Sequence, residues 1–189
     1  ECAPFENVYT LALRGLHDRA MNASNDMGDR KDMLQEALMA QRQMLIDAIG
    51  KPGEEIPQAF TPYKEVLDVY DEGLELPDDV TIIWPDDNYG YMKRLSSPKE
   101  QKRSGRSGVY YHSSYLGKPH DHLWMNTISP TLMYEELRKA YDATADRIWL
   151  LNAGDIKSCE FAVDYFLTMA FDIDSFNFER AANYRTEWL

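Results

Sequence analysis

The residues best suited to do chemistry follow a short run, Val80 to Trp84, that is rich in β-branched and aromatic side chains. A continuous run of this kind is typical of a strand that is buried on both faces, as in a parallel sheet. Pro85 ends the run, and Asp86, Asp87 and Asn88 come directly after it. Ligands of α/β proteins bind outside the carboxyl ends of strands, so these side chains are candidates for ligand binding. An ordinary Asp/Asn turn uses the same residues, and this segment alone fits both interpretations.

Polar side chains also lie at or just after the ends of three other strand-like segments, 8–13, 109–112 and 148–151. In chain order they are Arg14, Asp18, His112, Tyr115 and Asn152. Each has an ordinary explanation when it is taken alone. Arg14 and Asp18, for example, have the i,i+4 spacing of a surface ion pair, and a glutamate such as Glu65 is favoured in the first turn of a helix. The recurrence of polar residues at all four strand ends favours a functional site instead.

A second chemical interpretation uses the histidines. His120 and His122, together with His112 and Asp86, are of the residue types that bind zinc and related metals. Alternating histidines can bind one metal ion when they lie on one face of a strand. Pro119, however, places His120 in a loop, so the sequence favours a site without a metal or another cofactor.

Helix-like segments separate these strands. Apolar residues recur at helical spacing over 32–49, and Gly50 and Pro52 follow as a helix stop. Thr61-Pro62, Ser97-Pro98 and Ser129-Pro130 each have the form of a helix start. The predicted helices are 32–49, one from 61 to before Gly73, a short one from 97, 129–143, 159–171 and 178–189. The segment 51–60 is interpreted as a linker that is too short to separate domains.

This alternation predicts parallel strands joined by right-handed crossovers. A doubly wound open sheet and part of an eight-stranded barrel both have such strands. The chain has no GxGxxG and no GKS or GKT loop, which removes support for the nucleotide-binding open sheets. Polar residues at every strand end are typical of the barrel. We therefore predict an α/β fold in which residues 1–189 form about half of a (β/α)8 barrel domain, with no second domain.

The barrel prediction has two geometric consequences. The segments 8–13, 80–84, 109–112 and 148–151 should be parallel neighbours in one sheet. The residues expected at one edge of that sheet are Arg14, Asp86, Asn88, His112 and Asn152. Half a barrel leaves sheet edges unpaired, so further parts of a longer chain are expected to cover them.

Composition limits the classes of partner. The formal net charge of −12, with 28% charged residues, argues against binding of nucleic acid. No apolar stretch approaches the roughly 20 residues of a membrane-spanning helix. Cys2 and Cys159 have neither metal-binding nor redox spacing. The chain begins at Glu1 without a signal peptide, and we expect it to be a piece of a longer protein.

Three long strings have a specific resemblance. WPDDNYGYMKRL, SGRSGVYYHSSYLGKPHDHLWMNT and RIWLLNAGDIKSCEF resemble the catalytic domain of glycoside hydrolase family 115, the xylan α-1,2-glucuronidases. The likeness extends from PFENVYTLALRG to YRTEWL. It implies an enzyme with a (β/α)8 barrel that removes α-1,2-linked (4-O-methyl)-glucuronic acid from glucuronoxylan with inversion. It also implies a larger, secreted or periplasmic protein that forms a homodimer.

The resemblance also implies roles for individual residues. The PYKEV string points to Glu65 as the catalytic acid, and the R-G-x-x-D string points to Asp18 as the base. The residues that would bind the uronic acid are Arg14, Asp86, Asp87, Asn88, His112 and Tyr115. Hydrolysis with inversion needs two carboxyl groups roughly 6.5–9.5 Å apart, with room for a water molecule between them. Arg14 could bind the carboxylate of the substrate through two hydrogen bonds.

Two other function classes stay open at this point. One is a metal-dependent barrel hydrolase that uses His112, His120 and His122. The other is a carbohydrate-binding remnant without catalytic activity.

Overall fold

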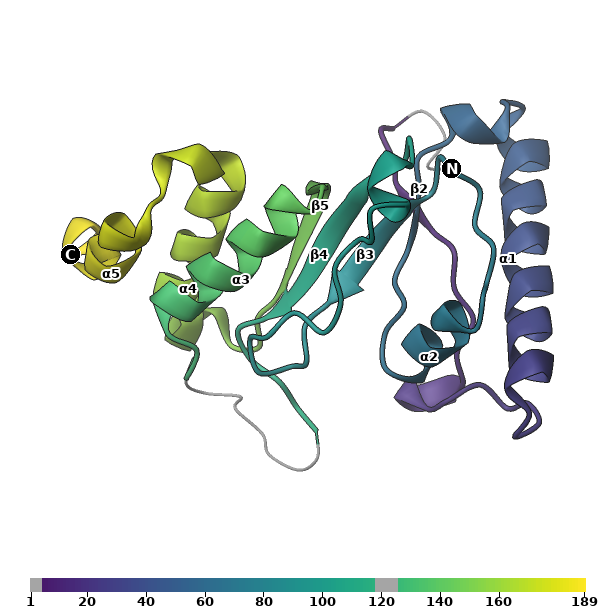
Figure 1. Ribbon diagram of the computed structural model, residues 1–189, viewed down its shortest axis with the longest axis horizontal. Coiled ribbons are helices and arrows are strands. Elements are labelled where there is room, and N and C mark those ends of the chain that lie inside the picture. Colours follow the sequence, from purple (N-terminus) through teal and green to yellow (C-terminus); the bar gives the residue numbers. More distant parts are fainter. Residues whose placement is uncertain (1–4, 118–125) are drawn as a thin grey trace. The chain divides into compact units, whose positions relative to one another are not determined.

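The computed structural model describes residues 5–117 and 126–189. Its strands form one five-stranded sheet in the order β1-β2-β3-β4-β5 (Figure 1). They are β1 (Tyr9–Thr10), β2 (Gln58–Phe60), β3 (Thr81–Pro85), β4 (Ser107–His112) and β5 (Ala145–Asn152). The pairings of β1 with β2, of β2 with β3 and of β4 with β5 are parallel.

α-Helices separate these strands along the chain, except between β3 and β4, where a 3-10 turn, Glu100–Lys102, takes that place. The α-helices are α1 (Met27–Ile49), α2 (Glu65–Asp71), α3 (Pro130–Asp142), α4 (Ile156–Phe171) and α5 (Phe178–Trp188). The strand order follows the chain order without the reversal that defines a doubly wound sheet. Sequential order is that of a (β/α)8 barrel, so the predicted α/β fold with parallel (β/α) units that make about half of a barrel is confirmed.

The expectation that the four predicted strands are all neighbours is wrong at one place. β2 lies between β1 and β3, in the segment 51–60 that we interpreted as a linker. Three residues are too few to show a hydrophobic period, although all three are buried. The side chain of Gln58 bonds the main-chain oxygens of Gly53 and Ile56, both at 2.9 Å, so a polar residue fits inside this short strand.

The chain forms two compact units. The first comprises the residues up to Ile83 together with Lys102–Arg106, and the second comprises Trp84–Gln101 and Ser107–Leu189. One partial barrel domain over residues 1–189 stays a prediction.

The first unit has an apolar core between α1, α2 and the first strands. Leu34 and Leu38 on α1 and Val69 on α2 are fully buried. At its border, Arg42 on α1 makes two hydrogen bonds to the carboxylate of Asp79, at 2.8 and 3.0 Å. Two parallel N–H···O bonds fix orientation as well as contact, so this pair holds α1 against the segment that leads into β3.

The core of the second unit is built by β4, β5 and the three C-terminal helices. Its largest fully buried side chains are Tyr111, Tyr165 and Phe166. The start of α3 is confirmed as predicted, because Ser129 caps the helix by accepting the N–H of Leu132 at 3.2 Å and Pro130 follows it. In the described residues, 5–117 and 126–189, no helix is long and apolar enough to cross a membrane.

Candidate active site

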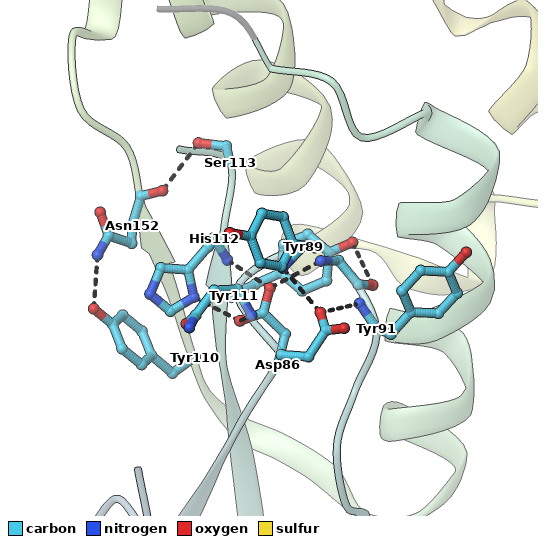
Figure 2. Close-up of polar contacts among 11 residues, drawn as sticks. Asp86, Tyr89, Tyr91, Tyr110, Tyr111, His112, Ser113 and Asn152 are labelled. Carbon is cyan, nitrogen blue, oxygen red and sulfur yellow. Dashed lines mark hydrogen bonds and ion pairs between the residues drawn. The ribbon is translucent and has the colours of Figure 1, made fainter. Parts of the chain in front are cut away.

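Asp86 is the most deeply buried carboxylate among the predicted site residues. It follows β3 and is 1% exposed. Its two oxygens accept the main-chain N–H groups of Asn88 at 3.1 Å, of Gly90 at 3.3 Å and of His112 at 3.2 Å (Figure 2). A buried charge needs such donors to offset its loss of hydration. Asp86 therefore shapes the backbone around it rather than presenting an open carboxylate.

His112 is the last residue of β4, and it is also 1% exposed. Its Nδ1 lies 2.5 Å from Oδ1 of Asp86. A carboxylate accepts hydrogen bonds, so Nδ1 carries the hydrogen in this contact. The rings of Tyr110 and Tyr115 lie 4.5 Å and 5.8 Å from the imidazole, centre to centre. The imidazole is thus oriented by one carboxylate and enclosed by two aromatic rings.

The residues after Asp86 form a loop, 86–92, that is organised by its own side chains. Oδ1 of Asp87 accepts the N–H groups of Tyr89 at 2.9 Å and of Tyr91 at 3.1 Å. Asn88 has a φ of 73°, a left-handed conformation that asparagine tolerates better than most residues. The turn interpretation of this segment is correct, because Asp86 and Asp87 accept main-chain N–H groups of the loop. That these residues bind a ligand stays a prediction.

Gly90 and Tyr111 hold the far side of the loop. The hydroxyl of Tyr111 donates to the main-chain oxygen of Gly90 at 2.9 Å. Gly90 has a φ of 98°, and a Cβ atom there would lie only 2.9 Å from the Tyr111 hydroxyl, so only glycine fits. Burial, and then the negative charges of Asp86 and Glu136, raise the pKa of Tyr111 well above its ordinary value. The phenol therefore stays neutral and keeps its hydrogen for this bond.

The end of β5 joins the same group of residues. The side chain of Asn152 donates to the hydroxyl of Tyr110 at 2.8 Å, and its main-chain oxygen accepts the hydroxyl of Ser113 at 3.0 Å (Figure 2). Within the second unit the structure thus brings together four of the five residues that were expected at one edge, which are Asp86, Asn88, His112 and Asn152.

Tyr110 and Tyr111 were not among the predicted site residues. The signal that could have found Tyr110 is the alternation of a strand, which puts residues two apart on the same face. Tyr110 therefore shares a face with His112, while Tyr111 points to the core. No local sequence pattern predicts the contact of Tyr111 with Gly90, because 21 residues separate them.

The predicted acid, Glu65, lies in the first unit as the first residue of α2. Arg14 donates to both of its oxygens, from Nε to Oε1 and from Nη2 to Oε2, each at 3.0 Å. The two side chains are about one-fifth exposed, at 20% and 22%. The guanidinium also lies over the ring of Tyr63, 5.5 Å from its centre. Arg14 and Glu65 are thus brought together, which their separation of 51 residues gave no reason to expect.

The backbone before Glu65 is strained. Lys64 has φ 53° and ψ −123°, a conformation that residues other than glycine avoid. Such a residue costs of order 1–3 kcal/mol and persists where surrounding contacts fix it, often at functional sites. It also explains why α2 begins at Glu65 and not at Thr61 as predicted: the chain turns at Lys64 before the helix can start.

The predicted base, Asp18, ends a short 3-10 turn, Leu16–Asp18, in the first unit. Its carboxyl group lies outside what the structure describes, so its distance from Glu65 stays untested. The segment around it borders a cavity of about 470 Å³. The residues that line this cavity are Gly15, Leu16, His17, Arg19, Ala20, Met21 and Asn22.

The metal interpretation depends on His120 and His122, which lie outside the described residues. In the part of the chain that is described, no group of three or more His, Cys, Asp or Glu side chains is arranged to hold a metal ion.

Comparison with known proteins identifies a family and similar solved structures. The model of glycosyl hydrolase family 115 matches residues 1–189. A solved structure described as a family GH115 4-O-methyl-α-glucuronidase with specificity for decorated arabinogalactans is 44% identical, with a TM-score of 0.88. The similarity covers 92% of this chain and 23% of that chain, so this chain spans less than a quarter of that protein. No curated protein matches. The chain belongs to glycosyl hydrolase family 115.

Proposed function

We propose that the protein is a glycoside hydrolase that removes α-1,2-linked (4-O-methyl)-glucuronic acid side chains from glucuronoxylan. Membership of family 115 over residues 1–189 supports this proposal, as does the similarity to a 4-O-methyl-α-glucuronidase. The observation that carries it is the contact between Arg14 and Glu65. It places a donor for carboxylates beside the carboxyl group that the family resemblance identifies as the acid.

Arg14 is assigned to recognition of the uronic acid. It already holds one carboxylate through two N–H groups, and a uronic acid brings the same chemical group. A substrate carboxylate on Arg14 would replace contacts that Glu65 now makes. Glu65, without its cationic partner, would take up a proton from water on one of its oxygens and turn that oxygen toward the glycosidic oxygen, so binding of the correct sugar would prepare the acid for its step.

The proposed reaction is a single displacement. The carboxyl group of Glu65 gives its proton to the glycosidic oxygen, and the bond from that oxygen to the anomeric carbon breaks with its electrons going to the oxygen. Water attacks the anomeric carbon from the opposite face, and Asp18 takes up the proton that the water loses. The products are glucuronic acid with inverted anomeric configuration and a polysaccharide with a free hydroxyl group.

In the second unit, we assign Asn88, His112 and Tyr115 to contacts with hydroxyl groups of the substrate. Asp86 and Asp87, which the family resemblance also places among the binding residues, hold the loop and the imidazole through the hydrogen bonds described above. For Asp86 this division follows from its hydrogen bonds, because both of its oxygens already accept protein N–H groups.

The proposal is tested by incubating the full-length protein with glucuronoxylan and, separately, with a glucuronic acid-decorated arabinogalactan. Release of (4-O-methyl)-glucuronic acid from xylan is expected, and proton NMR of the first product should show the β-anomer. Release from arabinogalactan alone would mean that arabinogalactan and not xylan is the substrate, while the proposed hydrolysis of a glucuronic acid side chain would stand. An α-anomer as the first product would contradict inversion, and no release from either polysaccharide would end the proposal.

We further propose that the full-length protein is a homodimer and that it acts outside the cytoplasm, in the medium or the periplasm. Family 115 enzymes act on extracellular polysaccharides, which supports the second statement. Light scattering coupled to size-exclusion chromatography should give twice the mass of one chain, and cell fractionation should recover the activity outside the cytoplasm. A monomer, or activity confined to the cytoplasm, would contradict the respective statement.

A further inference from the structure

Glu136 is a charged residue on the buried face of α3. Its neighbours on that face, Met133, Leu137 and Ala140, belong to the apolar core, yet Glu136 itself is only 6% exposed. Burial of a carboxylate costs several kcal/mol unless hydrogen bonds and an opposite charge compensate it. An apolar residue would fill this position at lower cost, so the contacts of Glu136 have to account for its presence.

The two oxygens of Glu136 make different contacts. Oε2 accepts the main-chain N–H of Met92 at 2.9 Å, and Oε1 lies 2.5 Å from the ammonium group of Lys139, which is half-exposed. The hydrogen bond that Lys139 donates to Glu136 raises the pKa of Lys139. Glu136 therefore has one oxygen on a surface lysine and the other on the backbone of the loop 86–92.

Met92 is the residue at which that loop closes. It pairs with Asp86 in an isolated antiparallel bridge, so the N–H that Glu136 binds belongs to the base of the loop. Asp86, on the other side of the bridge, holds the imidazole of His112 at Nδ1. A continuous series of contacts thus runs from α3 through Met92 and Asp86 to His112.

We propose that Glu136 is a positioning residue, which fixes the base of the loop 86–92 and thereby keeps Asp86 where it orients His112. It does not touch the substrate. The catalytic part of this inference rests on the proposed function, whereas the structural part concerns only the loop. This role requires a side-chain oxygen within hydrogen-bond distance of the Met92 N–H. It does not require a negative charge, because that N–H is neutral.

Two substitutions in the full-length enzyme distinguish the effect of side-chain length at position 136 from the effect of its charge. Glu136→Gln removes the charge and keeps an oxygen at the same distance from Met92. Glu136→Asp keeps the charge on a side chain that is one methylene shorter. Glu135→Asp is the matched control, because Glu135 is next in the chain, is exposed and lies 3.7 Å from the same Lys139. We expect Glu136→Asp to lower kcat by up to about 10²-fold, the loss that a misplacement of about 1 Å can cause. Glu136→Gln and Glu135→Asp should stay near wild-type activity.

Amide hydrogen exchange gives a readout that does not need activity. In Glu136→Asp the amides of Asn88, Gly90 and Met92 should exchange faster than in the wild type, and in Glu136→Gln they should not. Wild-type kcat and wild-type exchange in Glu136→Asp would overturn the inference. Equal losses of kcat in both variants, with equally lowered Tm, would show a merely structural role and also overturn it. A wild-type protein without glucuronidase activity would refute the proposed function, while the exchange experiment would still decide the role of Glu136.

Discussion

Replacing Glu65 by glutamine in the full-length enzyme is expected to nearly abolish release of glucuronic acid from xylan. Glutamine keeps the acceptor for Arg14 but has no proton to give, and loss of general acid catalysis typically costs 10²–10⁴-fold in rate. The same variant should retain much of its rate on an aryl glucuronide, because a phenolate leaves without protonation. The two rates are measured as kcat/KM and compared as lost transition-state stabilisation.

Two further variants make this expectation specific. Asp18→Asn should lower the rates on xylan and on the aryl glucuronide together, because water must be activated whichever group leaves. Glu72→Gln, at the other end of α2 and exposed, should change neither rate. Near-normal activity of Glu65→Gln on xylan would mean that another residue is the acid.

The second large effect is expected for Asp86→Asn. The buried carboxylate accepts three main-chain N–H groups and the Nδ1–H of His112, so the NH₂ group of asparagine must face at least one donor. A buried donor left without an acceptor costs about 1–3 kcal/mol. The free energy of unfolding, measured by chemical denaturation, should fall by about this amount, and activity should fall with it because His112 loses its orientation.

Asp87→Asn is the matched control for this substitution. At Asp87 one oxygen, Oδ1, accepts both main-chain N–H groups. Asparagine can place its own oxygen there, so the loop should persist and the free energy of unfolding should change by less than about 1 kcal/mol. A loss at Asp87 as large as that at Asp86 would show that charge, and not the arrangement of acceptors, holds the loop.

The sequence predicts the elements whose signals are local. The buried run at 80–84 became β3, and the Ser-Pro pair at 129–130 starts α3, because burial of a strand and capping of a helix depend on adjacent residues. β2 was missed, since its three residues carry no period. The late start of α2 was missed as well, because the strained conformation of Lys64 is imposed by contacts and not by its side-chain type.

In the candidate site, too, the sequence predicts some contacts and misses others. Asp86 and His112 were expected at one edge of the sheet because parallel strands end together, and the structure joins them by a hydrogen bond. The spacing of Arg14 and Asp18 suggested a local pair, yet a contact of Arg14 with Glu65 across 51 residues could not be read from any local pattern. Glu136 has a signal of its own, a charged residue at a core position of an amphipathic helix.

The loop 86–92 is held almost entirely by contacts made inside the protein, from the carboxylates of Asp86 and Asp87 to the hydroxyl of Tyr111. A sugar that binds there does not have to order a flexible segment first. Ordering costs roughly 0.5–1.5 kcal/mol for each mobile side chain that becomes fixed, and this loop has lost that freedom on folding. Under the proposed function, association with the polysaccharide should therefore lose little conformational entropy at this loop, which increases the affinity.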